Sequence, residues 1–163
     1  MATRWRSFRP WRGADVPESF ALVTPDPIDP ARLLGDTLSP DDGAALLFWG
    51  VVRNQNDGRP VSHLEYSAYG EMAEREMRRI ADEARERFGT GAIRVVHRIG
   101  TLAIGEASVA IAVASPHRAE AYEASRYVIE QLKQRVPVWK REGYVDGDTE
   151  WVPGFTPAVR EMA

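Results

Sequence analysis

Apolar residues follow a helical spacing in two stretches of the chain. Over residues 71–88 they recur every three or four positions, and Gly89 follows as a helix stop. Residues 115–136 repeat the pattern, with Ser115 expected as N-cap and Pro116 in the first turn. We predict two amphipathic helices that cover a sheet. Their apolar positions are Ala73, Met77, Ile80, Ala84 and Phe88 in the first, and Tyr122, Ala124, Val128, Ile129 and Leu132 in the second.

Strand patterns surround these helices. The continuous apolar run 43–52 predicts a strand buried on both faces, and 107–115, also nearly all apolar, predicts a central strand. Residues 61–69 alternate between apolar and polar, which is typical of a half-buried strand. Shorter strands are expected at 20–24, at 93–100 and in a hairpin over 138–152, and a short helix is expected to begin after Asp29. This order predicts an α+β fold of two layers, with helices packed on a mainly antiparallel sheet.

The length of 163 residues and the 44% apolar composition fit one domain with a hydrophobic core. We place this domain at 20–152, between an irregular N-terminal tail over 1–19 and a C-terminal tail over 153–163. The first tail mixes arginine with tryptophan and phenylalanine, which could stack on nucleic acid or rest on a membrane surface. A frayed terminus explains it more simply, so we assign it no function.

Composition excludes several function classes. A net charge of −3 gives no sign of a nucleic-acid or anionic-membrane partner. The absence of cysteine excludes disulfides, thiolate nucleophiles and cysteine-bound metals. The three histidines stand apart without ligand spacing and no glycine-rich phosphate loop occurs, so no metal and no cofactor is expected. With neither a membrane-length apolar run nor a signal-peptide pattern, we expect a cytoplasmic protein.

His117 and Arg118 form the first candidate site. Both fall in the first turn of the second long helix, where free backbone N–H groups favour an anion. Basic residues oppose the helix dipole at this position, so a bound phosphate would account for them. The alternative is that Arg118 pairs with Glu120 or a neighbouring acid and that His117 only covers a strand end.

Lys133 and Lys140 form the second candidate site, and the helix breaker Pro137 stands between them. Lys133, near a helix C-terminus, suits the dipole and needs no functional role. Lys140 lies beside Trp139 and near other charges, where its pKa could fall far enough for it to serve as base or nucleophile. Taken as isolated residues, both could equally be ordinary surface lysines.

Several segments match one family in order and spacing. They are GVVRNQNDG, LEYSAYGEMAEREM, VVHRIGTLAIGE, ASPHRAEAYEASRYVIEQLKQRVPVWKRE and a closing EWV. Over about residues 20–152 the chain resembles the large catalytic subunit of molybdopterin synthase. The resemblance implies an α/β hammerhead fold. It also implies a sulfurtransferase that converts cyclic pyranopterin monophosphate (precursor Z) into the dithiolene molybdopterin of molybdenum cofactor biosynthesis.

The resemblance implies partners as well. The sulfur donor would be the C-terminal thiocarboxylate of a small ubiquitin-like sulfur-carrier subunit, whose tail enters the pocket of the large subunit. Two large subunits would form a homodimer with one small subunit at each end, giving a heterotetramer. A chain without cysteine is consistent with sulfur that is delivered from outside.

Residues carry over individually from the resemblance. Lys140 is implied in proton transfer at the pterin, and Lys133 in orienting the thiocarboxylate or an acyl intermediate. The implied substrate-binding residues are Arg53, His117 and Arg118, with Phe48 expected to help wall the pocket. Their cationic groups would stabilise a phosphate and a developing oxyanion or thiolate.

The chain departs from the family after residue 152. There the family can supply an arginine to the neighbouring subunit's active site, whereas this sequence has Phe155 at that place and Arg160 at a shifted position. Two other classes of function also remain open on the residues alone. One is a lysine Schiff-base enzyme that uses Lys140 alone, and the other is a noncatalytic anion-binding regulatory module that uses His117 and Arg118.

Overall fold

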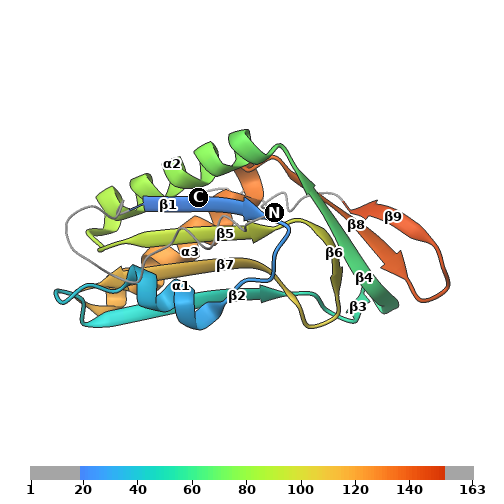
Figure 1. Cartoon of the computed structure of the whole chain (residues 1–163), viewed down its shortest axis with the longest axis horizontal. Coiled ribbons are helices and arrows are strands. Elements are labelled where there is room, and N and C mark those ends of the chain that lie inside the picture. Colours follow the sequence, from blue (N-terminus) through green and yellow to red (C-terminus); the bar gives the residue numbers. More distant parts are fainter. Residues whose placement is uncertain (1–18, 153–163) are drawn as a thin grey trace, which may run out of the picture.

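The computed structural model describes residues 19–152, which form three helices and nine strands (Figure 1). The helices are α1 (Pro30–Thr37), α2 (Gly70–Phe88) and α3 (Arg118–Arg135). The strands are β1 (Ser19–Thr24), β2 (Ala44–Val51), β3 (Gln55–Asn56), β4 (Arg59–Ala68), β5 (Ile93–Arg98), β6 (Gly100–Ala103), β7 (Ala107–Ser115), β8 (Val138–Tyr144) and β9 (Thr149–Val152). The predicted tails, with Phe155 and Arg160, lie outside the described residues, except that Ser19 belongs to β1, and the domain limits stay a prediction.

The first sheet has the strand order β1-β5-β7-β2 and is antiparallel except for the parallel pair β1 and β5. β7 pairs on both sides and every one of its residues is buried, so its predicted central position is confirmed. The prediction that β2 is buried on both faces is wrong, because β2 pairs only with β7 and its residues are only partly buried. A continuous apolar run does not distinguish a central strand from an edge strand.

Helices cover both faces of this sheet. α2 and α3 lie on one face and bury Met77, Ile80 and Val128 against Ile111 and its neighbours. Burial of such a side chain contributes about 1.5–3 kcal/mol. α1 lies on the other face (Figure 1), where Leu33 is buried in a second core cluster. The predicted α+β class, with helices on mainly antiparallel strands, is confirmed.

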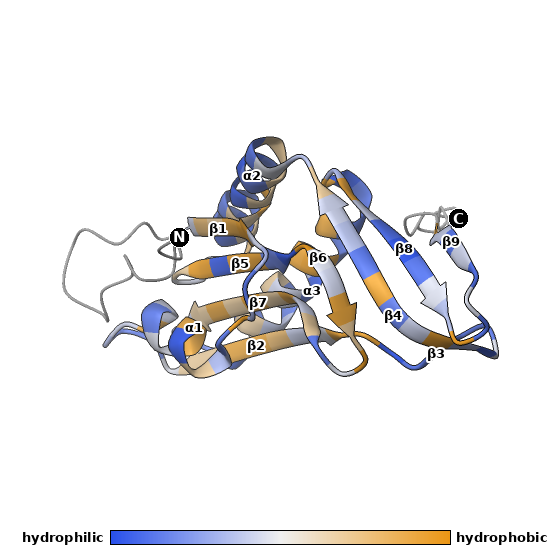
Figure 2. Ribbon diagram, turned by 45° about the vertical axis from the view of Figure 1, so that its right-hand side comes forward, coloured by the Kyte–Doolittle hydropathy of each residue, from blue (hydrophilic) through white to orange (hydrophobic). Residues whose placement is uncertain are grey.

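The second sheet stands at one end of the first, beyond β6 (Figure 1). Its strand order is β3-β4-β8-β9. β6 pairs with part of β4, along the edge of β4 opposite to β8. Two tight turns close its hairpins as predicted: one at Asp57 and Gly58, both with positive φ, and one containing Gly147, with φ of 95°. In Figure 2 the strand β8 is largely hydrophilic, whereas β5 and β7 carry broad hydrophobic bands.

Helix ends follow the sequence signals with one exception. α2 ends at Gly89, whose φ of 67° suits glycine, and the Asp29 side chain accepts a hydrogen bond from the Arg32 backbone N–H at the start of α1. The prediction that Ser115 caps α3 is wrong, because Ser115 is the last residue of β7 and pairs with β2. The helix begins two residues later than expected, with His117 as its N-cap. Tyr122 was predicted to be apolar core and is instead exposed.

Candidate active site

A cavity of about 530 Å³ lies where the two sheets meet the C-terminal half of α3. The first sheet contributes its end nearest the second sheet, α3 contributes its last turns, and β4 and β8 close the remaining side. Its lining includes Phe48, Arg53, Leu64, Tyr66, His97, Ser108, Val109, Lys133, Trp139, Lys140 and Glu142. A concave site of this size suits a small organic ligand.

Pro137 brings the two lysines to this cavity. Lys133 stands in the last turn of α3, and the helix ends at Arg135 because Pro137 has no N–H with which to continue it. The chain then enters β8 at Val138 in an extended conformation and folds back along β4. Lys133 and Lys140 therefore reach one cavity from two different elements.

Strand alternation decides which side chains of β8 face the cavity. Lys140 lies directly opposite Tyr66 on β4, and Glu142 lies opposite Leu64, and all four line the cavity. Arg141, one position away, is not among the lining residues and forms an ion pair with Glu65. Of the WKRE segment, Trp139, Lys140 and Glu142 line the cavity and Arg141 does not.

The electrostatic surroundings lower the pKa of Lys140 from its ordinary value. Burial is the largest cause, and the positive charges of Lys133 and Arg53 act in the same direction, while Glu142 opposes them. The sequence suggested a lowered pKa from neighbours such as Trp139 and Arg141, whereas the responsible cations come from α3 and from the loop after β2. A lowered pKa increases the share of neutral amine that can accept a proton.

Lys133 and Lys140 are the only lysines in the whole sequence. The chain has 21 basic residues, and the other 19 are arginine. Arginine supplies a permanent positive charge, whereas lysine can lose its proton when it is buried. Both lysines of the sequence line the same cavity.

Glu142 is the buried anion of this wall, with 3% of its surface exposed. Its carboxylate accepts a hydrogen bond of 2.8 Å from the Tyr144 hydroxyl and one of 3.1 Å from the Asn56 side-chain amide. The first contact raises the pKa of Tyr144 to about 12. These donors hold the carboxylate in place beside Lys140.

Two further predicted residues also lie at the cavity. Phe48 on β2 lies opposite Ile111 of β7, packs against the main core and forms part of the wall, as expected. Arg53 follows β2 in an exposed loop. The backbone of Val52 fixes that loop by hydrogen bonds with Gly105 and Glu106. Arg53 thereby adds a permanent cation to the lining.

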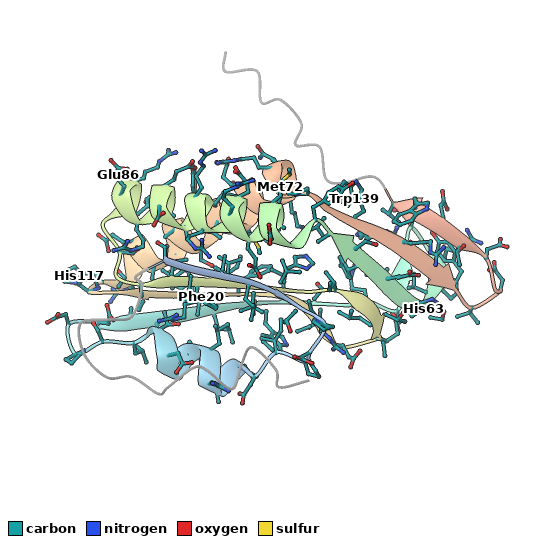
Figure 3. All side chains as sticks on the ribbon, turned by 45° about the horizontal axis from the view of Figure 1, so that its top comes forward. Phe20, His63, Met72, Glu86, His117 and Trp139 are labelled. Carbon is teal, nitrogen blue, oxygen red and sulfur yellow. The ribbon has the colours of Figure 1, made fainter. Side chains whose placement is uncertain are left out.

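His117 and Arg118 do not lie at the cavity within one chain. Both are exposed at the N-terminus of α3, and the rise of an α-helix places His117 about 24 Å from Lys133. Figure 3 labels His117 at one end of the molecule and Trp139, a residue of the cavity, well away from it. Within residues 19–152, neither His117 nor Arg118 forms an ion pair, so the alternative pairing of Arg118 with Glu120 does not occur.

Sequence reasoning missed three polar residues of the inner wall. They are Tyr66, His97 and Ser108, which come from β4, β5 and β7. Tyr66 had one usable signal, since it alternates with Glu65 on a predicted strand. The pairing that sets it opposite Lys140 joins segments more than seventy residues apart, and no local pattern encodes such a pairing.

No three His, Asp or Glu side chains within residues 19–152 are grouped so as to hold a metal ion. None of the described helices has both the length and the apolar character that crossing a membrane requires.

The fold and the cavity define a class: a small α+β protein with one pocket that joins two lysines and an arginine to a buried carboxylate. The family model described as "MoaE protein" matches residues 23–135. The chain belongs to the MoaE protein family, the family of the molybdopterin synthase catalytic subunits. It is accordingly a sulfurtransferase of molybdenum cofactor biosynthesis.

Individual relatives agree with this assignment. The molybdopterin synthase catalytic subunit of Thermoplasma volcanium is 41% identical over 133 residues, which cover 82% of this chain and 97% of the relative. That of Emericella nidulans is 42% identical over 124 residues, and the match spans 76% of this chain and 64% of the relative. The crystal structure of molybdopterin synthase from Staphylococcus aureus aligns with a TM-score of 0.76 at 39% identity, covering 85% of this chain and 98% of that one.

A fourth comparison concerns the fold alone. A complex of subunits 1 and 2 of the molybdopterin-converting factor from Helicobacter pylori contains a chain that aligns with a TM-score of 0.67 at 20% identity. The alignment covers 81% of this chain and 89% of that chain.

Proposed function

We propose that this chain transfers sulfur from the C-terminal thiocarboxylate of a small sulfur-carrier subunit to precursor Z and so forms the dithiolene of molybdopterin. The observation that carries the proposal is the convergence of the only two lysines of the sequence, with Arg53, on one cavity. Both reactants are anions, a thiocarboxylate and a phosphate ester, and the cavity collects cations from three elements. A cationic site with restricted access to water stabilises such groups more strongly than bulk solvent does.

The two lysines suit different steps. Lys133 is exposed at the end of α3 and suits binding of the thiocarboxylate anion as an ammonium group. Lys140 is half-buried with a lowered pKa, which suits a residue that accepts a proton from the pterin while sulfur is added. Arg53 remains charged throughout and suits the phosphate or a developing negative charge. Phe48 limits access of water on the side of β2.

The carrier subunit is part of the proposal. The Helicobacter pylori neighbour was solved as a complex of two subunits, which supports a small partner in this family. Beside the cavity, exposed Trp139 and Tyr69 lie edge to face with ring centroids 5.5 Å apart, and Met72 of α2 is also exposed. We place the docking of the carrier on these three side chains, from which its C-terminal tail would enter between Lys133 and Lys140.

A second copy of the chain would account for His117 and Arg118. Their distance from the cavity of their own chain excludes a direct role there, yet two basic groups at a helix N-terminus remain an anion site. In the homodimer implied by the family, we propose that they contribute to the pocket of the neighbouring copy and bind the substrate's phosphate. The heterotetramer and the cytoplasmic location stay predictions.

The proposal is tested by incubating the full chain with precursor Z and a carrier that bears either a thiocarboxylate or an ordinary carboxylate. Molybdopterin is expected only with the thiocarboxylated carrier, at up to half an equivalent per carrier, since each product takes two sulfurs. Product formation from free sulfide at the same rate without carrier would contradict the proposed donor.

A further inference from the structure

The inner wall of the cavity differs chemically from its cationic part. Tyr66, His97 and Ser108 lie together there, and none of them carries a charge at neutral pH. The rings of Tyr66 and His97 meet edge to face with centroids 5.2 Å apart. The single proton of the Ser108 hydroxyl can go to the carbonyl oxygen of Gly50, 3.4 Å away, or to the Tyr66 hydroxyl oxygen, and the second arrangement leaves the Tyr66 proton for a ligand. Apolar Leu64 and Val109 flank this neutral group.

His97 presents a hydrogen-bond acceptor. Its Nδ1 lies 2.9 Å from the backbone carbonyl oxygen of Arg98, and a carbonyl can only accept, so Nδ1 carries the proton. Nε2 then holds a lone pair, and it makes no hydrogen bond within residues 19–152. Only 4% of the His97 surface is exposed, and burial lowers its pKa to about 4. The ring is therefore neutral under physiological conditions.

Tyr66 presents a donor beside this acceptor. Burial raises the pKa of its hydroxyl, and the negative charge of Glu142 acts in the same direction, while the Ser108 contact opposes both. The phenol therefore stays protonated. Because Tyr66 stands directly opposite Lys140 in the β4–β8 pair, this donor and the amine belong to the same wall.

An adjacent neutral donor and acceptor, set between apolar side chains, complement the edge of a flat heterocycle that has both a ring N–H and a ring carbonyl. They do not complement a phosphate, which offers only acceptors. A polar pocket of this kind discriminates strongly, because a ligand without the matching groups leaves buried atoms unpaired.

Resting on the proposed function, we infer that Tyr66 and His97 form the subsite for the pterin ring of the substrate: Nε2 of His97 accepts from a ring N–H, and the Tyr66 hydroxyl donates to the ring carbonyl oxygen. The cationic residues then take the anionic groups, and the substrate lies between the two parts of the cavity. His97 and Tyr66 are substrate-binding residues in this arrangement and take no part in proton transfer.

The test measures binding without turnover. Both probes are measured on the full chain without carrier. Direct fluorescence titration gives the Kd of unsubstituted pterin, which has no phosphate. Competition with precursor Z gives the Kd of inorganic pyrophosphate. The variants are His97→Asn, which removes the Nε2 acceptor, His97→Gln, whose Oε1 can replace it, and Tyr66→Phe. Circular dichroism and thermal unfolding check that each variant is folded.

We expect pterin to bind His97→Asn and Tyr66→Phe at least about tenfold more weakly than wild type, which corresponds to ~1.4 kcal/mol. His97→Gln should remain within about threefold, and pyrophosphate should bind all four proteins equally. Equal losses in His97→Asn and His97→Gln, an unchanged pterin Kd in Tyr66→Phe, or no saturable pterin binding by wild type would each overturn the inference. Conversion of precursor Z with carrier tests the proposed function separately, because a chain can bind pterin through His97 and still fail to transfer sulfur.

Discussion

Lys140 shows at the scale of one residue why the chain uses lysine here and arginine elsewhere. A guanidinium stays protonated at every pH at which the protein is folded, so it can bind an anion but cannot accept a proton. An amine that is half-buried next to two other cations can do both in turn. The choice of residue type therefore distinguishes the proposed base from Arg53, which lines the same cavity with a permanent charge.

Replacing Glu142 by Gln should shift the pH dependence of activity. The negative charge of Glu142 raises the pKa of Lys140, so its removal lowers that pKa further. If neutral Lys140 is the base, kcat/KM rises as pH passes through this pKa, and the rising limb should move to lower pH in Glu142→Gln. Steady-state rates of molybdopterin formation across the pH range measure the limb. A limb that stays in place or moves upward would refute Lys140 as the base.

His97 makes folding stability depend on pH in a predictable direction. Its pKa is about 4 in the folded protein and 6.5 as a free side chain, so the unfolded state binds the proton more readily. Its contribution is complete above pH 6.5 and is lost as pH falls toward 4. Between about pH 7 and about pH 4.5, wild type should lose about 2 kcal/mol more unfolding free energy than His97→Gln.

Urea unfolding of both proteins at the two pH values gives this difference. All other titrating groups are common to the two chains, so their contributions cancel. Equal losses in both proteins would mean that His97 has the same pKa in the folded state as in the unfolded state, as an exposed side chain does.

At the scale of an element, the side chains of neighbouring residues on β8 point to different sides of the strand and therefore have different roles. Arg141 points away from the cavity, pairs with Glu65 and lies near the Trp151 ring, and both charged side chains are more than a third exposed. Arg141→Ala should lower stability by less than ~1 kcal/mol. Its kcat/KM should stay within about threefold of wild type, because no interaction with the substrate is lost. A loss in Arg141→Ala as large as that in Lys140→Ala would contradict the assigned faces of the strand.

The elements that the sequence predicts well are those with local signals. Gly89, Asp29 and the turn at Asp57 and Gly58 each determine a helix end or a hairpin through their own backbone geometry, and all act as predicted. Predictions failed where pairing partners decide. Ser115 could cap a helix but belongs to β7, and β2 has the composition of a central strand but lies at an edge.

Some residues of the candidate site were predicted from the sequence, and others were missed. The family resemblance identified Lys133, Lys140, Arg53 and Phe48, and the structure brings all four to one cavity. It also implied His117 and Arg118 for the substrate pocket, although the helical pattern already placed them at the opposite end of one helix from Lys133, and within one chain they do not reach the cavity. Tyr66, His97 and Ser108 were missed, since their meeting is a product of tertiary packing.

At the scale of the whole molecule, α3 carries Arg118 at its N-terminus and Lys133 in its last turn. If Arg118 serves the cavity of a second copy, variants defective at different ends should complement each other in a mixed dimer. Lys140→Ala and Arg118→Ala should each be inactive alone. After unfolding together and refolding, an equal mixture should recover about a quarter of wild-type activity, because half of the dimers carry one intact site. No recovery, with mixed dimers verified by two affinity tags, would contradict the contribution of Arg118 to the cavity of the second copy.

The most direct test of the central claim is single-turnover conversion of precursor Z with thiocarboxylated carrier by wild type, Lys133→Ala and Lys140→Ala. Arg126→Ala is the matched control, since Arg126 is an exposed cation on α3 that does not line the cavity. Each lysine variant, checked for folding, should lose at least ~100-fold, equivalent to a barrier higher by ~2.7 kcal/mol, and the control should retain its rate. Folded lysine variants that react as fast as wild type would contradict the claim that the two lysines on either side of Pro137 carry the chemistry.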